Sequence, residues 1–326
     1  MESIVFPELD CPFPRVVNVH ADAVHRGSVD WVRRFQLIPK EQNFRLFDAI
    51  GIGWLVARTH PDSPLDDLQL ISDWHAWLFI LDDVRDDSEV NRDPEALSNM
   101  DNRFLDILEG KNPNKWDIPL VLALNELRSR LSEYVKARKL SGVWLRRFIR
   151  TIKDTFEVSL WEADNRAREV TPGIESYLRM RRLAGGLSII TELTEIIEGI
   201  HLPHEVREHP TVRRLTDASD NVICWANDIL SLDKELEHDE VNNLIVVLSV
   251  TEDFTMQQAV DRAAEMYEAE MDLFVDLEQN LPSFGLALDS ALERYISLLR
   301  ARIRGVIDWS YESVRYRATL ESDVKI

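Results

Sequence analysis

The chain has 326 residues, of which 45% are hydrophobic and 29% are charged, and these fractions predict a water-soluble globular protein with a substantial core. Its formal net charge of −20 argues against nucleic acid or anionic lipid as a partner. No apolar run is long enough to cross a bilayer, so we expect no stable membrane insertion. The N-terminal residues do not read as a signal peptide, and two cysteines are too few for a disulfide framework, so we expect a cytoplasmic protein.

Long segments carry apolar residues at the i, i+3, i+4 and i+7 spacing of amphipathic helices, separated by short loops rich in Pro, Asn and Gly. In chain order, the spacing predicts helices over residues 27–37, 41–60, 64–85, 94–110, 117–137, 141–168, 173–199, 204–237, 254–280 and 284–308. No segment shows the alternation of a strand. We therefore expect one all-α domain over residues 1–326, a helical bundle around a central apolar cavity, with an N-terminal strap over 1–25 and a flexible tail over 317–326.

The first acidic segment lies where an apolar, aromatic-rich helix is predicted to end. It includes Asp82, Asp83, Asp86 and Asp87, and because Asp82 and Asp86 are four residues apart, they share one helical face. Mg²⁺ prefers oxygen ligands and is commonly held by one or two carboxylates together with substrate phosphates. An ordinary acidic helix end would have the same composition, so this segment alone leaves both interpretations open.

The second segment runs from Asn227 to Glu235 inside a predicted helix. Asn227, Ser231 and Glu235 recur every four residues and form one stripe along that helix. An amide oxygen, a hydroxyl and a carboxylate are again oxygen ligands suited to Mg²⁺. Asn and Ser are poor residues for the middle of a helix, so their alignment with a glutamate favours a ligand site over a solvated face.

Together, the two segments resemble the metal-binding motifs of class I terpene synthases. The sequence from Asp82 to Asp86 matches the DDxxD motif, and the sequence from Asn227 to Glu235 matches the NDxxSxxKE motif. The resemblance implies that three Mg²⁺ ions bind between the motifs, and that Mn²⁺ can substitute. It assigns metal binding to Asp82, with Asp83 and Asp86 in support and Asp87 as the alternative to Asp86, and to Asn227, Ser231 and Glu235.

A basic segment followed by two glycines lies between the motifs. Arginine presents a planar fork that matches phosphate oxygens, and a glycine pair inside a helical pattern predicts a break. By resemblance, Arg181 is the residue that senses the diphosphate and Gly185 is the effector at the helix break, with Arg182 as the competing assignment for the sensor. Ala184 stands where the family often has an acid.

Near its end the chain carries Arg315 and Tyr316, which resemble the family's Arg-Tyr pair. The resemblance implies that both donate hydrogen bonds to the diphosphate when the site closes. It also makes Lys234 a further diphosphate contact.

Aromatic side chains are expected in the cavity wall, because the face of an aromatic ring stabilises a cation without offering a base. Phe79 is the first candidate, since it lies about one turn before Asp82 on the same helix. Trp309 is the second candidate and Trp54 is the third.

The resemblance covers residues from about 5 to 316 and implies a magnesium-dependent cyclase that ionises farnesyl diphosphate to a cyclic sesquiterpene, either a hydrocarbon or an alcohol. Geranyl and geranylgeranyl diphosphate are alternative substrates. A trans-prenyltransferase normally has a second aspartate-rich motif in place of the segment from Asn227 to Glu235. A silent isoprenoid-binding homologue would keep the fold without turnover. The expected partner is the small-molecule diphosphate, and the family allows a homodimer.

Overall fold

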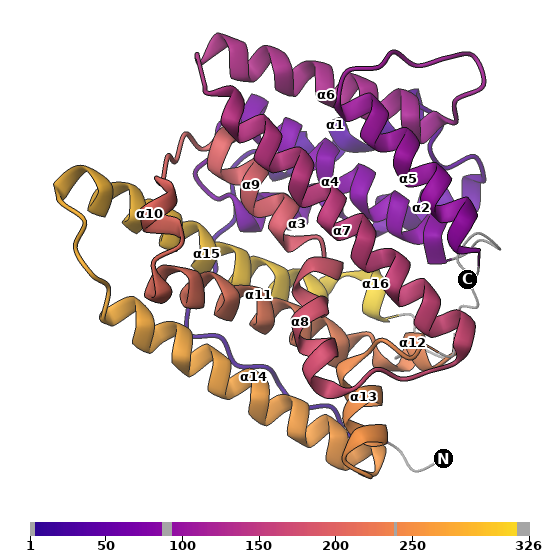
Figure 1. Cartoon of the computed structure of the whole chain (residues 1–326), viewed down its shortest axis with the longest axis vertical. Helices are drawn as coiled ribbons and strands as arrows, with labels where there is room; N and C mark the ends of the chain where they lie inside the picture. Colours follow the sequence, from indigo (N-terminus) through magenta and orange to yellow (C-terminus); the bar gives the residue numbers. More distant parts are fainter. Residues whose placement is uncertain (1–3, 87–92, 238–239, 318–326) are drawn as a thin grey trace.

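The computed structural model describes residues 4–86, 93–237 and 240–317, and every regular element within these ranges is a helix (Figure 1). The helices are α1 (Ala21–Arg34), α2 (Glu41–Ile50), α3 (Ile52–Thr59), α4 (Leu65–Asp86), α5 (Pro94–Leu108), α6 (Pro119–Ala137), α7 (Gly142–Arg168), α8 (Ile174–Ala184), α9 (Leu187–Ile197), α10 (His204–Arg207), α11 (Pro210–Leu230), α12 (Leu232–Glu237), α13 (Leu244–Thr251), α14 (Met256–Gln279), α15 (Leu286–Glu312) and α16 (Val314–Arg317). The all-α prediction is confirmed. None of these helices combines the length and apolar composition that crossing a membrane requires.

Helix α4 lies at the centre of the first of two hydrophobic cores. It is apolar on nearly every face, as expected for a helix with neighbours on all sides, and Trp74 and Trp77 are fully buried. Trp74 packs edge-on against Phe148 of α7, and Trp77 packs edge-on against Phe104 of α5. Helices α1, α3, α6 and α9 also contact α4. The acidic end of α4 therefore projects from a densely packed frame.

The second core lies between α8, α11, α13, α14 and α15, in the lower half of Figure 1. Helix α11 packs along α14 and also contacts α15. Leu230, at the end of α11, and Val306 of α15 pack against both cores. The seam between the two cores thus runs beside the C-terminal end of α11, where the second predicted motif lies.

The segment before α1 forms a strap that crosses the second core. It runs along α14 and α15 in Figure 1. The backbone N–H of Leu9 donates to the hydroxyl of Tyr311 on α15 at 2.9 Å, and the ring of Phe13 packs edge-on against Phe274 of α14. The strap is shorter than the predicted 1–25, because α1 begins at Ala21. Of the predicted tail, residue 317 belongs to α16, and residues 318–326 lie outside the described residues.

The predicted helix over 173–199 is divided into α8 and α9 at the predicted glycine pair, and two other predicted helices are divided where no break was predicted. The predicted helix over 41–60 breaks at Gly51, whose φ of +76° lies in the left-handed region that glycine adopts readily. The predicted helix over 204–237 consists of α10, α11 and α12. Pro210 begins α11 because it lacks the N–H that would continue α10, and Ser231 lies in a turn between α11 and α12.

Two further features differ from the sequence prediction. Helix α13 was not predicted, because its eight residues are mostly β-branched and show no polar face; Asn243 caps its first turn by accepting from the backbone N–H of Ile245. Trp54 was expected in the cavity wall, but its side chain is partly exposed on α3, with the guanidinium of Arg58 above its ring. That prediction was wrong, since the buried side of α3 is formed by its small and aliphatic residues.

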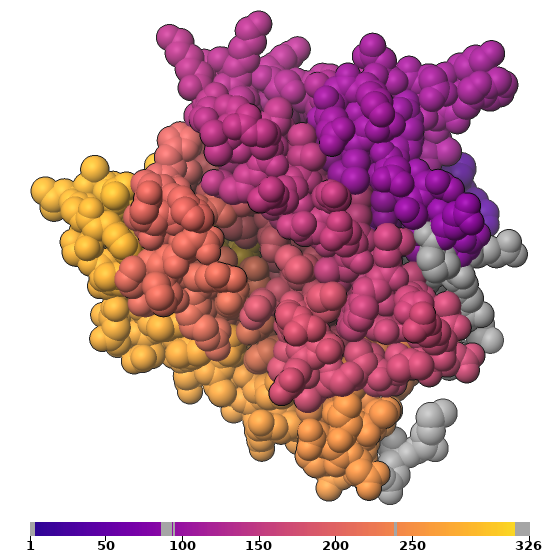
Figure 2. All heavy atoms as spheres, viewed as in Figure 1, coloured from indigo at the N-terminus to yellow at the C-terminus, as the bar shows by residue number. Residues whose placement is uncertain are grey.

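Figure 2 shows a hollow between α9, α10 and α11, with α15 at its bottom. Its volume is about 130 Å³. Its lining is largely polar and includes Glu192, Arg207, Asp217 and Tyr295. Glu192 and Arg207 form an ion pair with each other, so much of the charge in this hollow is already neutralised.

Candidate active site

The first acidic segment forms the last turns of α4. The side chains of Asp82 and Asp83 are 62% and 41% exposed, so both can reach a ligand at the surface of the bundle. Arg315 lies beside them, with Nη1 3.1 Å from Oδ1 of Asp83 and Nη2 3.5 Å from Oδ2 of Asp82. Asp86 is the last residue of α4, and Asp87 lies outside the described residues. The two aspartates thus already hold a cationic group.

The second segment keeps its three ligand candidates together even though the helix is interrupted. The hydroxyl of Ser231 donates to the backbone carbonyl oxygen of Asn227 at 2.7 Å and lies 2.6 Å from Oε1 of Glu235. Nδ2 of Asn243 donates to Oε2 of Glu235 at 2.7 Å. Burial, together with the charge of Asp228, raises the pKa of Glu235 to about 7. The hydroxyl of Ser231 and the carboxyl group of Glu235 therefore lie together, and Ser231 also contacts the backbone of Asn227.

Helix α16 joins the two motifs. Arg315 contacts Asp82 and Asp83, whereas the hydroxyl of the next residue, Tyr316, accepts a hydrogen bond from Nδ2 of Asn227 at 2.8 Å. Consecutive residues of one short helix thus touch both acidic segments. The aspartates of α4 and the polar stripe of α11 and α12 consequently belong to one site.

Arg181 reaches the second motif from α8. Its Nη2 donates to Oδ1 of Asn227 at 2.8 Å, and its Nε donates to Oδ1 of Asp228 at 2.9 Å. Arg182 instead points toward Asp217, with 3.7 Å between Nη1 and the carboxylate. Between the two candidates for the sensor, the structure therefore places Arg181 at the site.

The predicted helix break lies one turn after Arg181, at Gly185 and Gly186. Helix α8 ends at Ala184, and Gly186 has a φ of +66°, which only glycine adopts readily. At Gly185 an added Cβ would lie 3.1 Å from Sγ of Cys224, so the chain passes close to α11 there. The glycine pair thus lies against α11 one turn before the second motif.

Aromatic rings pack against one another behind the first motif. Phe79 and Trp309 meet edge-to-face at 5.7 Å, and Trp309 meets Tyr316 in the same manner at 5.7 Å. The guanidinium of Arg315 lies 5.1 Å from the centre of the Phe79 ring. Phe79 already faces one cation at this place, which is the arrangement that a cation–π contact requires.

Two more charged side chains act on this region. Lys234 on α12 is close enough to Asp82 for its charge to favour the ionised carboxylate. Glu162 on α7 was not predicted; burial raises its pKa to about 7, and Arg181 and Asp82 are among the charges that act on it. The charges of both motif regions thus reach Glu162, and its sequence neighbourhood on α7 carries no metal-binding pattern that could have identified it.

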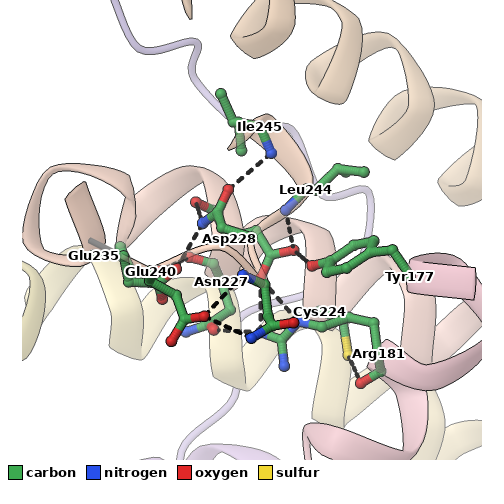
Figure 3. Close-up of polar contacts among 12 residues, drawn as sticks. Tyr177, Arg181, Cys224, Asn227, Asp228, Glu235, Glu240, Leu244 and Ile245 are labelled. Atoms are coloured by element: carbon green, nitrogen blue, oxygen red, sulfur yellow. Dashed lines mark hydrogen bonds and ion pairs between the residues drawn. The ribbon is translucent and has the colours of Figure 1, made fainter. Parts of the chain in front are cut away.

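Sequence reasoning also missed the residues that surround Asp228. This carboxylate accepts from the hydroxyl of Tyr177, from Arg181 and from the backbone N–H of Leu244 (Figure 3). Asn243 donates both to the carbonyl oxygen of Asp228 and to Glu235. In the sequence, only the place of Asp228 beside Asn227 in the motif pointed to this residue, and that place does not indicate which distant residues bind it.

The oxygen groups gathered here fit a hard divalent cation. In the second motif the hydroxyl of Ser231 lies 2.6 Å from a carboxylate oxygen of Glu235, and the side-chain amide oxygen of Asn227 accepts from Arg181. The first motif offers two aspartates that hold a guanidinium. In the part of the chain that the structure describes, no three His, Cys, Asp or Glu side chains are grouped so that they could hold a metal ion by themselves. Such a site suits Mg²⁺, which keeps several waters and binds substrate phosphates in addition to one or two carboxylates.

The chain matches the family model of terpene synthase family 2, C-terminal metal binding, over residues 73–272. It is 33% identical to the germacrene A synthase of Nostoc punctiforme, over 97% of this chain and 96% of the relative. It is 34% identical to the (+)-T-muurolol synthase ((2E,6E)-farnesyl diphosphate cyclizing) of Roseiflexus castenholzii, over 95% of this chain and 94% of the relative. The crystal structure of the SVS_A2 protein from ancestral sequence reconstruction has a TM-score of 0.84 at 26% identity, covering 94% of this chain and 90% of that chain. With its helical bundle and its two joined motifs, the chain belongs to the terpene synthase family.

Proposed function

We propose that the protein is a class I terpene cyclase that ionises farnesyl diphosphate and releases diphosphate and a cyclic sesquiterpene, either a hydrocarbon or an alcohol. The observation that carries the proposal is the contact of Arg315 with the first motif and of Tyr316 with the second, which joins both motifs in one site. The relative from Roseiflexus castenholzii is named as farnesyl diphosphate cyclizing, which supports this substrate.

The proposal includes three Mg²⁺ ions, with Mn²⁺ able to substitute. When bound, such ions neutralise the diphosphate charge and assist the departure of the leaving group. The groups that would hold them have hard oxygen atoms and lie at the ends of α4 and α11 and on α12. These residues are Asp82, Asp83, Asp86 or Asp87, Asn227, Ser231 and Glu235.

Four further side chains are proposed to bind the diphosphate itself, namely Arg181, Lys234, Arg315 and Tyr316. Heterolysis of the allylic C–O bond leaves the electron pair, and hence an additional negative charge, on the diphosphate. Fixed donors and cations at that place stabilise the developing charge. Arg315 is paired with aspartates in this structure, so it would turn toward the phosphate oxygens when substrate binds.

The isoprenoid chain is left with the positive charge. Phe79 and Trp309 are proposed to stabilise it through their ring faces, and exclusion of water keeps the cation from being captured early. The cascade then ends by proton loss or by addition of one water molecule. Gly185 is proposed as the effector at the helix break, since it directly follows the helix that carries Arg181.

The test is to incubate the purified protein separately with geranyl, farnesyl and geranylgeranyl diphosphate, each with Mg²⁺ or with EDTA, and to analyse a hexane extract by gas chromatography–mass spectrometry. We expect a cyclic C15 product from farnesyl diphosphate with Mg²⁺ only. Longer diphosphates formed after addition of isopentenyl diphosphate would identify a trans-prenyltransferase instead. A folded protein that turns over no substrate would be a silent isoprenoid-binding homologue.

A matched pair of variants links the reaction to the site. Asp82→Asn should abolish the product, because the amide cannot replace the anionic ligand. Asp66→Asn changes an aspartate at the opposite end of the same helix, where it lies in the first turn, and should leave the product unchanged. A homodimer and a cytoplasmic location stay predictions; light scattering after size-exclusion chromatography would determine the former.

A further inference from the structure

Asp228 is the acid of the second motif that does not belong to the stripe of ligand candidates. Its side chain is 1% exposed, and both carboxylate oxygens are occupied. Oδ1 accepts from Nε and Nη2 of Arg181 at 2.9 and 2.7 Å, and Oδ2 accepts from the backbone N–H of Leu244 at 3.1 Å and from the hydroxyl of Tyr177. A carboxylate with this set of donors has no free approach for a metal ion. Asp228 therefore acts through the groups that donate to it, foremost Arg181.

The pairing of Asp228 with Arg181 involves one edge of the guanidinium. Nε and Nη2 donate to Asp228, and Nη2 also donates to Asn227. Nη1 has no hydrogen-bond partner among the residues that the structure describes, and it lies 3.5 Å from the position that a Cβ on Gly185 would take. Arg181 is therefore fixed along one edge and keeps donors on the other edge for an anion.

Tyr177 completes this arrangement from the same helix. It lies four residues before Arg181, so both side chains project from the same face of α8, as Figure 3 shows. Its side chain is fully buried, and its hydroxyl contacts Oδ2 of Asp228, the oxygen that Arg181 does not use. Tyr177 and the N–H of Leu244 thus determine how the carboxylate plane is turned, and the carboxylate plane determines how the guanidinium lies.

We propose that Tyr177 and Asp228 are positioning residues that orient the guanidinium of Arg181 toward the diphosphate before the substrate arrives. The inference rests on the proposed function, in which Arg181 binds the diphosphate. An arginine side chain loses much rotamer freedom when it is ordered, so ordering it in the free enzyme leaves more binding free energy for the substrate. Asp228, the motif acid that is not among the ligand candidates, would thus act by holding Arg181.

The test compares binding of inorganic pyrophosphate with Mg²⁺ by isothermal titration calorimetry in four proteins: the full-length wild type, Tyr177→Phe, Arg181→Lys and the double variant. Loss of a hydrogen bond to a charged group should weaken pyrophosphate binding by roughly tenfold in Tyr177→Phe. In the Arg181→Lys background the same change should alter the affinity by less than about twofold, because the group that Tyr177 orients is gone.

The matched control is Tyr295→Phe. Tyr295 is also buried and its hydroxyl bonds one side chain, that of Thr216 at 2.9 Å, but it lies on α15 away from Arg181. We expect this variant to bind pyrophosphate like the wild type, even if its thermal unfolding temperature falls. If Tyr177→Phe does not fold, Asp228→Asn takes its place, since it keeps the shape and removes the charge; the same coupling to Arg181→Lys is then expected.

The outcomes of these experiments distinguish failure of the positioning role from failure of the cyclase proposal. Wild-type affinity in Tyr177→Phe, or an equal loss in both backgrounds, would mean that Tyr177 only stabilises the fold, and it would overturn the positioning role while leaving the cyclase proposal intact. Absence of magnesium-dependent pyrophosphate binding in the wild type would overturn both proposals. A product from farnesyl diphosphate together with coupled losses in the cycle supports both.

Discussion

Arg302 of α15 joins three helices in the interior of the protein. Its side chain is 7% exposed; Nη2 lies 2.6 Å from Oδ1 of Asp220 on α11, and Nη1 lies 2.5 Å from the hydroxyl of Thr191 on α9. Asp220 is equally enclosed, with 6% of its side chain exposed. Arg302 thus ties α9, which follows the helix break, to α11 and α15. We predict that Arg302→Met is strongly destabilising.

The expected loss of stability in Arg302→Met follows from the buried carboxylate of Asp220, which is left without its cationic partner. Breaking a buried ion pair by removing one partner typically costs about 3–5 kcal/mol. Burial already raises the pKa of Asp220 from 3.8 to about 6, although Arg302 acts against this shift. In the wild type, the stability that protonated Asp220 contributes is therefore present below pH 3.8 and lost as the pH rises to about 6. Without Arg302 the pKa of Asp220 rises further, so the free energy of unfolding continues to fall as the pH rises above 6.

The assay is urea unfolding followed by tryptophan fluorescence at pH 5.5 and pH 8. We expect a free energy of unfolding at pH 8 that is lower than that of the wild type by about 3–5 kcal/mol, and a smaller difference at pH 5.5. Arg300→Met is the matched control: Arg300 lies two residues away on the same helix, is 44% exposed and pairs with Glu278, and it should change stability by less than about 1 kcal/mol. Equal losses at both pH values, or a double variant with Asp220→Asn that is as unstable as Arg302→Met at pH 8, would refute the reasoning.

Three further predictions concern single residues. Gly186→Ala should lower the free energy of unfolding by about 1–2 kcal/mol, because the φ of +66° at this position is unfavourable for a residue with a Cβ. Gly173 lies in open space at a φ of −68°, so Gly173→Ala should be neutral. Equal effects of the two changes would contradict this reasoning. Ser231→Ala should raise the Mg²⁺ concentration needed for half-maximal turnover by about 10–100-fold, and Ser231→Thr, which keeps the hydroxyl, should largely restore it. Burial raises the pKa of Glu195 from 4.5 to about 7, so the stability that its protonated form contributes is lost as the pH rises through this range; thermal unfolding scans should show less dependence on pH in Glu195→Gln, and an unchanged dependence would exclude Glu195 as a cause.

Local patterns in the sequence predicted the helices and the two motifs because each depends on residues that are close together in the chain. Apolar spacing identified α4 and its acidic end, and the glycine pair at 185 and 186 indicated the break that the structure has. The stripe of Asn227, Ser231 and Glu235 was predicted on an unbroken helix. The structure interrupts the helix at Ser231, whose hydroxyl lies within hydrogen-bond distance of the carbonyl oxygen of Asn227.

What the sequence could not indicate are contacts between distant helices. Tyr177 and Asp228 are 51 residues apart and their bond depends on the packing of α8 against α11, which no periodicity encodes. For the same reason Trp54 was misplaced, since its helix turns at Gly51 by an angle that the sequence does not specify. Helix α13 was missed because a short run of buried β-branched residues reads equally as strand or helix.

The strap has a consequence for how the protein forms in the cell. Leu9 and Tyr311 are separated by 302 residues, and Phe13 meets Phe274 on α14. Synthesis proceeds from the N-terminus, so the strap leaves the ribosome long before α14 and α15 exist to receive it. Its apolar side chains therefore stay without their partners until nearly the whole chain has been made. Docking of the strap belongs among the last folding events, at the same stage at which α16 completes the site.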